Sequence, residues 1–397
     1  MKILVVIPYF MPATSYGGPV KVAYDLARSL ARRGHRVTVA TTDVFDDKAR
    51  VAQRTETMEG ISVVRFRNVS NRLAKRCNGY TPFLFIPWLW KHGGEFDAIY
   101  CHDFFTMQTI AVSIFSRLSK VPFIVQPHGC LSPVRREARF SAVKRLFTAI
   151  FGTILTGARH IVALTAEERN GIVLLKRDIA EKIAVVPNGL DLAEIQVPER
   201  IDLHRKYGLP SGSIVIGFIG RLAYIKGIDI SLEVLASLKK TVNFSFLVMG
   251  PDEGVLDELK METHRLGISD RVVFTGIVNG AEKMQAVASC DLCLFTSRDE
   301  GLPMTVLEVA ALGVPQVLSA ECNVPEVAEH GAGYVHPVSD IAALARCVAE
   351  LAAAPEKRAE MGKRARAMVE TLFSLDSQTA RVEALLAGDP RPQPRDL

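Results

Sequence analysis

The sequence predicts an α/β protein made of two doubly wound domains, each with a parallel sheet covered by helices on both faces. Short apolar runs alternate with helix-period stretches along nearly the whole chain, which is typical of such sheets. The alternation starts again after residue 210. The chain has 397 residues, and at roughly 100–200 residues per domain this length corresponds to two domains rather than one core.

The first half of the chain begins with a strand-like run and a helix. The helix is predicted over Gly18–Arg33, because Val22, Leu26 and Leu30 recur on one side and Gly34 ends it. Further helical stretches lie at Phe105–Leu118 and Glu137–Leu155. The predicted strands of this half are Lys2–Ile7, Val37–Ala40, Ile61–Phe66, Ala98–Cys101, Phe123–Gln126, His160–Leu164 and Ile183–Val186.

A segment without an apolar run separates the two halves. Leu190–Gly212 holds Pro198, Gly208 and Pro210 among many charges, which indicates a domain boundary. We therefore expect domains at 1–190 and 191–373, and a disordered Pro-rich tail at 388–397. The predicted strands of the second half are Ile214–Ile219, Phe244–Met249, Val272–Phe274, Leu292–Phe295 and Gln316–Ser319. Because ligands of such sheets bind beyond the carboxyl ends of the strands, two facing sheets predict a site in the cleft between them.

The composition is that of a globular chain. Apolar residues make up 48%, charged residues 23%, and the mean hydropathy is +0.17, which excludes disordered and collagen-like classes. No run approaches the roughly 18–20 apolar residues of a membrane-spanning helix. Lys2–Ile7 is too short for a signal-peptide core, and the seven cysteines are scattered and odd in number, so we expect a cytosolic chain.

The charge is unevenly distributed. Residues 1–200 carry 28 Lys and Arg against 17 Asp and Glu, a net +11, whereas the remaining residues have a net charge of −6. This asymmetry favours an anionic partner for the first half, such as a membrane surface, although an ordinary solvated basic face explains it equally well. No recognised nucleic-acid-binding motif accompanies the charge, so we do not expect nucleic acid as a partner.

Two segments of the first half are candidates for lying on anionic lipid. One is a basic stretch with apolar residues around it, formed by Arg135, Arg136, Arg139, Lys144 and Arg145. The other is Thr81–Trp90, which holds both tryptophans. Packing between domains is the alternative explanation of both segments.

The first candidate for chemistry is the segment GFIGRLAYIKG at Gly217–Gly227. A strand ends at Gly220, and Arg221 and Lys226 follow in a short loop before the next helix. Two cations close to a helix N-terminus favour an anion, most plausibly phosphate. The segment lacks the Gly-Lys-Ser/Thr ending of a P-loop and the Gly-x-Gly-x-x-Gly of a dinucleotide site. Taken alone, Arg221 and Lys226 would be interpreted as surface charges.

The second candidate is SRDEGLPMTVLEVAALGVP at Ser297–Pro315. Pro303 at the first helical position and Gly313 past the end predict a helix over 303–312. Glu300 then precedes the helix and Glu308 lies along it, flanked by apolar residues, where a charge needs a partner. Carboxylates of this kind accept hydrogen bonds from pairs of hydroxyls, as in a sugar or a ribose. A capping acid and a solvent-facing glutamate are the plain alternative.

The third candidate is the loop YFMPATSYGGP at Tyr9–Pro19. Gly17 and Gly18 stand at a helix start, where glycine lets a ligand approach the backbone and the helix end favours phosphate. An ordinary turn explains the same pair. Cys290 and Cys293 have the spacing of metal ligands, but no second pair accompanies them, and a core role is the expectation.

Together these segments resemble a known family. Glu300-x7-Glu308 within EGLPMTVLEVAALGVP, the loop GRLAYIKG, PNGLD at Pro187–Asp191 and the early Gly-Gly loop are similar to the retaining glycosyltransferases of family four. These enzymes have the GT-B fold, two facing Rossmann-like domains with the active site in the interdomain cleft. The resemblance covers residues 2–385 and is most specific over 215–320.

The resemblance implies a role for individual residues. Arg221 and Lys226 match the pair that grips the donor diphosphate, Glu308 the residue on the ribose, and Glu300 the residue on the transferred sugar. His128, which follows a predicted strand, matches a histidine beside that sugar, and the final helix, at 374–386, is expected to pack back on the first domain. The remaining donor-binding positions implied are Gly17, Gly18, Ile277, Val278, Gly301, Leu302, Pro303, Met304 and Thr305.

The implied reaction moves a hexose from a UDP- or GDP-linked sugar to a glycan or lipid-linked acceptor in surface polysaccharide or lipopolysaccharide synthesis. Retention of configuration follows from the resemblance alone. No Asp-x-Asp occurs in the chain, so we expect neither a metal nor a cofactor besides the nucleotide-sugar co-substrate. Two alternatives stay open: a nucleotide-sugar epimerase of the same fold, and a non-catalytic nucleotide-sugar-binding protein.

Overall fold

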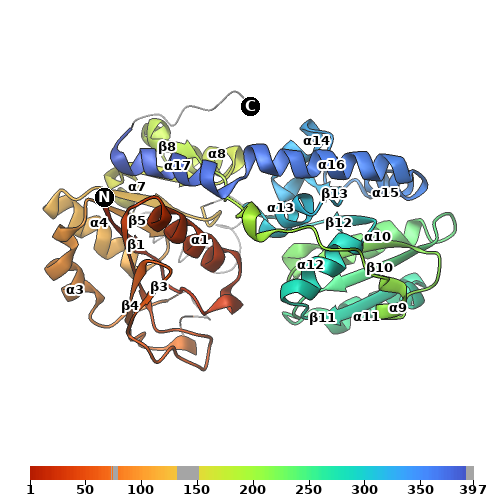
Figure 1. The fold of residues 1–397 in the computed structure, drawn as a ribbon, viewed down its shortest axis with the longest axis horizontal. Coiled ribbons are helices and arrows are strands. Elements are labelled where there is room, and N and C mark those ends of the chain that lie inside the picture. Colours follow the sequence, from red (N-terminus) through yellow and green to blue (C-terminus); the bar gives the residue numbers. More distant parts are fainter. Residues whose placement is uncertain (73, 75–78, 132–151, 390–397) are drawn as a thin grey trace. The chain divides into compact units, whose positions relative to one another are not determined.

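The computed structural model describes residues 1–72, 74, 79–131 and 152–389. The chain divides into two compact units, one formed by Met1–Gly189 with Leu375–Leu397 and the other by Leu190–Ser374. Figure 1 labels many of the helices and strands of both units. None of the described helices is long and apolar enough to cross a membrane.

The first unit is built on an eight-stranded sheet with the order β3-β4-β2-β1-β5-β6-β7-β8. All neighbours are parallel except β3 and β4, which are antiparallel. The strands are β1 Lys2–Val6, β2 Arg36–Thr42, β3 Thr55–Met58, β4 Ile61–Phe66, β5 Ala98–His102, β6 Phe123–Gln126, β7 His160–Ala163 and β8 Ile183–Val185. The helices are α1 Gly18–Arg32, α3 Phe85–His92, α4 Met107–Ser119, α7 Thr153–Gly157, α8 Ala166–Leu175 and α17 Leu375–Ala387, with the 3-10 turns η1 Thr14–Tyr16, η2 Gly93–Glu95 and η3 Arg177–Lys182.

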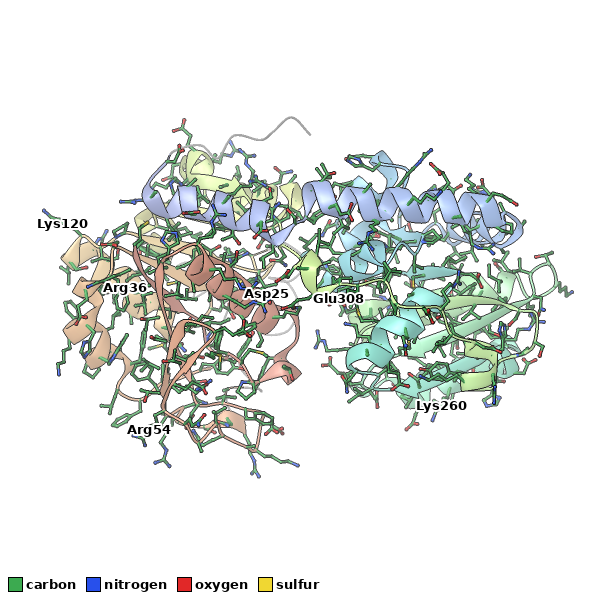
Figure 2. The ribbon with its side chains drawn as sticks, in the orientation of Figure 1. Asp25, Arg36, Arg54, Lys120, Lys260 and Glu308 are labelled. Carbon is green, nitrogen blue, oxygen red and sulfur yellow. The ribbon has the colours of Figure 1, made fainter. Side chains whose placement is uncertain are left out.

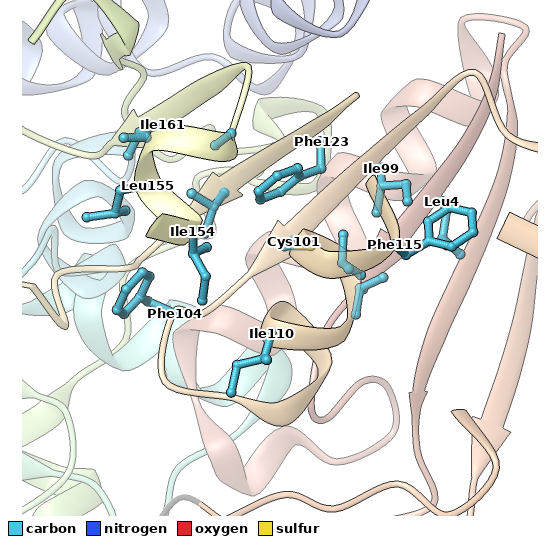
Figure 3. Close-up of a cluster of buried hydrophobic side chains, with 14 of the residues drawn as sticks. Leu4, Ile99, Cys101, Phe104, Ile110, Phe115, Phe123, Ile154, Leu155 and Ile161 are labelled. Carbon is cyan, nitrogen blue, oxygen red and sulfur yellow. The ribbon is translucent and has the colours of Figure 1, made fainter. Parts of the chain in front are cut away.

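Alternate residues of each strand enter two separate cores, one on each face of this sheet. Leu4 and Val6 of β1 pack with residues of α3, α4, α7 and α8. Figure 3 labels part of this cluster, including Leu4, Phe115 of α4 and Ile154 of α7. Ile3 and Val5 pack on the other face with α1 and α17. A strand buried on both faces needs apolar residues on both faces, which explains why β1 is apolar at every position from Ile3 to Val6.

The last helix of the chain belongs to this first unit. Val382, Leu385 and Leu386 of α17 lie in the core that α1 covers. The Glu383 carboxylate accepts hydrogen bonds from Arg33 Nε at 2.6 Å and from His35 Nε2 at 2.9 Å.

The second unit is built on a six-stranded, all-parallel sheet with the order β11-β10-β9-β12-β13-β14. Its strands are β9 Ile214–Ile219, β10 Phe244–Met249, β11 Val272–Gly276, β12 Leu292–Phe295, β13 Gln316–Ser319 and β14 Gly333–His336. Its helices are α9 Leu203–Tyr207, α10 Ile228–Ser237, α11 Leu256–Leu266, α12 Gly280–Ser289, α13 Met304–Ala311, α14 Glu326–Glu329, α15 Ile341–Ala353 and α16 Pro355–Leu372, with η4 Leu192–Glu194, η5 Tyr224–Lys226, η6 Ser269–Arg271 and η7 Ala320–Cys322.

The predicted fold class is confirmed, with differences at particular elements. Each of the predicted strands is present, whereas β3 and β14 were not predicted. The predicted helix over Phe105–Leu118 begins later, at Met107, because the Thr106 hydroxyl caps it by accepting the Thr109 N–H. Most of the predicted helix Glu137–Leu155, and residues 390–397 of the predicted tail, lie outside the described residues.

Candidate active site

The predicted site residues fall into two sets, one in each unit. The set in the second unit follows the carboxyl ends of β9, β11 and β12, and contains the predicted cations and glutamates. The set in the first unit follows β1 and β6, and contains Gly17, Gly18 and His128. Figure 2 labels Glu308 among the side chains of the second unit.

Both predicted phosphate-binding cations are paired with carboxylates. Arg221, which follows Gly220 at the end of β9, is half exposed, and its guanidinium donates to Glu253 Oε1 at 2.6 Å. Lys226, in η5, is mostly buried and its Nζ pairs with Glu300 Oε1. Lys226 and Glu300 are therefore direct partners, which the sequence did not predict.

Arg298 fixes the loop that carries Lys226. Its backbone N–H donates to Ile225 O at 2.8 Å, and its guanidinium donates to Tyr224 O at 2.7 Å. The same guanidinium makes a bidentate pair with Asp229, at 2.9 and 2.5 Å, and lies 4.0 Å from the centre of the Tyr224 ring. Hydrogen bonding to Asp229 raises the pKa of Arg298. The end of β12 therefore holds η5 in place through a permanent cation.

Gly227 allows this loop to lie against β12. Its φ is +60°, and a Cβ there would lie 1.9 Å from the carbonyl oxygen of Thr296. Its own carbonyl accepts the Thr296 hydroxyl at 2.6 Å. No side chain fits at this position without moving the loop, so glycine is required for the placement of Lys226.

The Glu300 segment is anchored by backbone and side-chain contacts. Its carboxylate also accepts the Ser297 hydroxyl, at 3.0 Å, and its carbonyl accepts Asn323 Nδ2 at 2.6 Å. Its N–H donates to Glu321 O at 2.9 Å. Glu300 is thus held in one orientation, with a cation beside it, at the amino-terminal side of α13.

Helix α13 carries the second glutamate. It spans Met304–Ala311, one residue shorter at each end than predicted, because Pro303 is extended (φ −74°, ψ 112°) and forms the N-cap. Glu308 Oε2 accepts Lys283 Nζ of α12 at 2.6 Å, with 13% of the Glu308 side chain exposed. Lys283 is therefore the partner that a charge in such an apolar helix requires.

The other predicted donor-binding positions surround these groups. Leu302 and Pro303 are buried, whereas Gly301, Met304 and Thr305 are partly exposed. Ile277 follows β11 and is 63% exposed, and Val278 beside it is partly exposed.

In the first unit, Gly17 and Gly18 form the start of α1. Gly17 has φ +81° and ψ −146°, a conformation open to glycine alone, and it is the N-cap of α1 without a side-chain cap. The Tyr9 and Tyr16 rings stack at 4.5 Å in the loop before it. The N-cap of α1 therefore supplies no side-chain acceptor of its own.

His128 forms a pair with a histidine that the sequence analysis missed. His102 Nδ1 lies 2.8 Å from His128 Nε2, and the two rings stack at 5.1 Å with 13° between their planes. Burial lowers the pKa of His128 to about 4 and that of His102 well below its usual range. Both imidazoles are therefore neutral near pH 7.

Several partners of the site residues carried no sequence signal. Lys283 and Glu253 lie outside the three candidate segments, and their contacts with Glu308 and Arg221 depend on how separate parts of the unit pack. Arg298 lies within the second candidate segment, but nothing in the sequence indicated its contacts with η5. His102 did have a signal, because it ends β5, which pairs with the β6 strand that leads to His128. Histidines that follow adjacent parallel strands meet at one sheet edge.

The cysteine pair is buried, as expected for a core role. Cys290 is the C-cap of α12 and only Cys293 lies in β12. A Cβ on Gly217 would lie 2.7 Å from Cys290 Sγ and 3.1 Å from Cys293 Sγ, so both sulfur atoms pack on this glycine. Within the described residues, no group of three or more potential metal ligands is assembled.

Comparison with known proteins identifies the family. Residues 16–194 match the model of Glycosyltransferase Family 4, and residues 199–368 match that of Glycosyl transferases group 1. The chain is 24% identical over 338 residues to an uncharacterised glycosyltransferase of Methanocaldococcus jannaschii, covering 83% of each chain. It is 25% identical to the D-inositol 3-phosphate glycosyltransferase of Stackebrandtia nassauensis over 79% of this chain and 74% of the relative.

Solved structures give the same fold. The chain superimposes on Anabaena HepE in complex with UDP with a TM-score of 0.75 at 22% identity, covering 98% of this chain and all of that one. It superimposes on WaaG, a glycosyltransferase involved in lipopolysaccharide biosynthesis, with a TM-score of 0.68 at 18% identity, over 97% and 100% of the two chains. The two consecutive family matches and the shared architecture show that the chain belongs to the family-four glycosyltransferases, enzymes of the GT-B fold.

Proposed function

We propose that this glycosyltransferase moves a hexose from a UDP- or GDP-linked donor to a glycan or lipid-linked acceptor, with retention and without a divalent metal. The observation that carries the proposal is the set of charges after β9 and β12. Arg221 and Lys226 stand on one loop, and Glu300 and Glu308 stand at and along α13. A donor of this class offers a diphosphate to the cations and hydroxyls to the carboxylates.

The chemistry required is stabilisation of a leaving group. As the anomeric C–O bond breaks, negative charge grows on the distal phosphate. Arg221 and Lys226 stabilise that charge, and the fixed loop around Gly227 keeps Lys226 from reorganising during the reaction. In this proposal a bound phosphate shares Lys226 with Glu300, whose carboxylate then faces the hydroxyls of the sugar.

Fixed cations take the role that a metal has in other transferases. The chain contains no Asp-x-Asp, the motif that commonly holds such a metal. We expect turnover to be unchanged by EDTA. A loss of activity in EDTA that Mg²⁺ or Mn²⁺ restores would contradict metal independence.

The nucleobase of the donor is either uracil or guanine in this proposal. HepE is solved with UDP-glucose, and a phosphatidylinositol monomannoside mannosyltransferase of Mycobacterium tuberculosis, 28% identical over 53% of this chain, is GDP-mannose-dependent. Thermal shift with UDP and GDP separates the two, because a ligand that binds only the native state raises the melting temperature.

A substitution at Glu308 tests whether this residue binds the ribose of the donor. In the proposal its carboxylate accepts the 2′ and 3′ hydroxyls, so Glu308→Gln weakens binding of the preferred nucleoside diphosphate by roughly 10- to 100-fold. The same change leaves binding of the 2′,3′-dideoxy analogue unaffected. An equal loss of affinity for both ligands would contradict this role of Glu308.

Product analysis separates the alternatives. A transferase needs an acceptor and forms a glycosidic bond with retained configuration, which NMR of the product shows. An epimerase releases a changed sugar from the donor alone, and a binding protein leaves both substrates intact. We expect transfer to acceptors of surface polysaccharide or lipopolysaccharide synthesis, which is the pathway that the family resemblance implies.

An exposed apolar surface on the first unit supports the proposal that the protein binds an anionic membrane and that its acceptor lies in that membrane. Ile86 and Trp90 lie one turn apart on α3, and Ile114 and Leu118 one turn apart on α4, each between 47% and 65% exposed. Helices α3 and α4 pack together, with the Trp90 and Phe115 rings 5.5 Å apart. We call these four residues the α3–α4 patch.

The α3–α4 patch is surrounded by positive charges, which can bind the phosphates of phospholipid headgroups. Lys91, Arg117 and Lys120 are exposed next to it. Figure 2 labels Lys120 at the outer end of α4. An aromatic ring with flanking cations is typical of an interfacial anchor. The predicted basic stretch at Arg135–Arg145 lies outside the described residues, so this proposal depends on α3 and α4 instead.

Vesicle flotation tests the α3–α4 patch. The full chain is expected to float with phosphatidylglycerol vesicles and not with phosphatidylcholine vesicles. Trp90→Gln with Leu118→Gln abolishes flotation, whereas Leu174→Gln, a single exposed leucine on α8 (72%), leaves it unchanged. Equal flotation of the two variants would contradict the assignment.

A further inference from the structure

The pair formed by His102 and His128 holds a single proton between its two nitrogen atoms. His102 Nδ1 and His128 Nε2 are 2.8 Å apart, a hydrogen-bond distance, so one nitrogen donates and the other accepts. Burial keeps both rings neutral near pH 7, and each ring therefore carries one N–H. The position of the shared proton fixes the tautomer of both residues together.

The surroundings of His102 decide which nitrogen donates. Its Nε2 is buried and has no hydrogen-bond partner among the described residues. A buried N–H without an acceptor is rarer in native proteins than an acceptor without a donor. The proton of His102 therefore lies on Nδ1 and is donated to His128 Nε2, and this leaves the proton of His128 on Nδ1.

The backbone of His128 is held in place from the other side. His128 has φ +55°, a left-handed conformation that is unfavourable for a residue other than glycine. The Glu168 carboxylate accepts the N–H of the next residue, Gly129, and also that of Leu164 at 2.8 Å. Strained backbone conformations that neighbours maintain in this way are concentrated at functional sites.

We infer that His102 is a positioning residue that fixes His128 as the Nδ1–H tautomer, so that His128 acts as a hydrogen-bond donor to a hydroxyl of the transferred sugar. The part of this inference that concerns the sugar rests on the proposed function, and the part that concerns the tautomer does not. The hydrogen bond of the His128 side chain within the described residues is at Nε2, and Nδ1 is not among the fully buried atoms of this part of the chain, although most of the ring is buried.

Nitrogen NMR of the full chain without substrate tests the tautomer. In the wild type, the His128 ring is expected to show a protonated Nδ1 and an unprotonated Nε2. His102→Asn keeps an N–H donor close to the position of Nδ1 and leaves this signature unchanged. His102→Asp offers only an acceptor and moves the His128 proton to Nε2. His160→Asn, at the start of β7 in the same sheet, is the control and leaves the signature of His128 unchanged.

Kinetics test the consequence, with UDP-glucose and GDP-mannose as the donors assayed. His102→Asn is expected to keep kcat within about threefold, and His102→Asp to lower kcat roughly 10- to 100-fold. Equal loss in both variants would indicate a merely structural histidine and overturn the inference, as would a wild-type His128 protonated on Nε2. If the tautomer is as inferred but neither donor is turned over, the proposed function fails and the pairing of the histidines stands.

Discussion

Lys226 and Glu300, 74 residues apart in the chain, form an ion pair in which 14% and 10% of the side chains are exposed. The pair joins the loop after β9 to the segment after β12. A charge this buried loses most of its hydration, and its partner compensates for the loss. Two residues that are proposed to bind the donor therefore also stabilise each other in the structure without a donor.

The first prediction concerns this ion pair. Lys226→Ala or Glu300→Gln alone is expected to lower the free energy of unfolding by about 2–4 kcal/mol, because the partner is left as an uncompensated charge. The double variant should lose about 1–3 kcal/mol less than the sum of the single variants. Urea unfolding of the four full-length proteins measures this coupling, and additive losses would show that the pair contributes no mutual stabilisation.

The second prediction separates activity from stability at Arg221. Its pair with Glu253 is 50% and 40% exposed on the two sides, and exposed ion pairs contribute about 1 kcal/mol or less. Arg221→Ala should therefore leave the melting temperature nearly unchanged. It should lower kcat roughly 100-fold, because the leaving phosphate loses a fixed positive charge that stabilises it.

A matched control for Arg221 lies in the same unit. Arg265 pairs with Glu262 on α11 and is 65% exposed. Arg265→Ala removes an exposed cation away from the loop after β9, so its turnover is expected to equal that of the wild type. If the two alanine variants lose activity equally, Arg221 has no special role in catalysis.

The third prediction compares two glycines with similar backbone angles. Gly227 and Gly208 have φ of +60° and +66°, but a Cβ lies 1.9 Å from the Thr296 carbonyl oxygen at Gly227 and has nothing within 4 Å at Gly208. Gly208→Ala should cost only the left-handed conformation, about 1–2 kcal/mol. Gly227→Ala should also displace the Lys226 loop and lower kcat, and equal effects of the two changes in thermal unfolding and in activity assays would contradict this role of Gly227.

The fold followed closely from local sequence patterns because the strands are buried on both faces. Ile214–Ile219 is a continuous apolar run and Phe244–Met249 is interrupted only by Ser245, and they form β9 and β10 with the predicted bounds. Thr55–Met58 was missed because β3 is an antiparallel edge strand with an exposed face, and its sequence, TETM, has no apolar run. An edge strand of this kind is defined by its pairing rather than by its composition.

The site was predictable only in part, for a similar reason. The positions of Arg221 and Glu308 could be predicted because strand ends and helix starts are recognisable in the sequence. Their partners Glu253 and Lys283 depend on the reach of long side chains between separate elements, and no local pattern encodes that. His102 lies between these cases, since the order of the strands, once known, places it beside His128.

The last prediction is a pH dependence of stability. The pKa of His128 is about 4 in the folded chain, lowered by burial from its ordinary value of 6.5, so the unfolded chain binds more protons between these pH values. Stability is therefore nearly complete above about pH 7 and falls as the pH decreases toward 4, by about 3 kcal/mol for this residue. His102, whose pKa is also lowered, adds a loss of the same sign.

The variant His128→Asn tests this pH dependence, because asparagine tolerates the left-handed backbone. Its free energy of unfolding should fall less steeply between pH 6.5 and 4 than that of the wild type. The control is His264→Asn, at an exposed histidine of the other unit, which should follow the wild type. Urea unfolding at a series of pH values measures these slopes, and a His128→Asn slope equal to that of the wild type would show that His128 is not buried as a neutral imidazole.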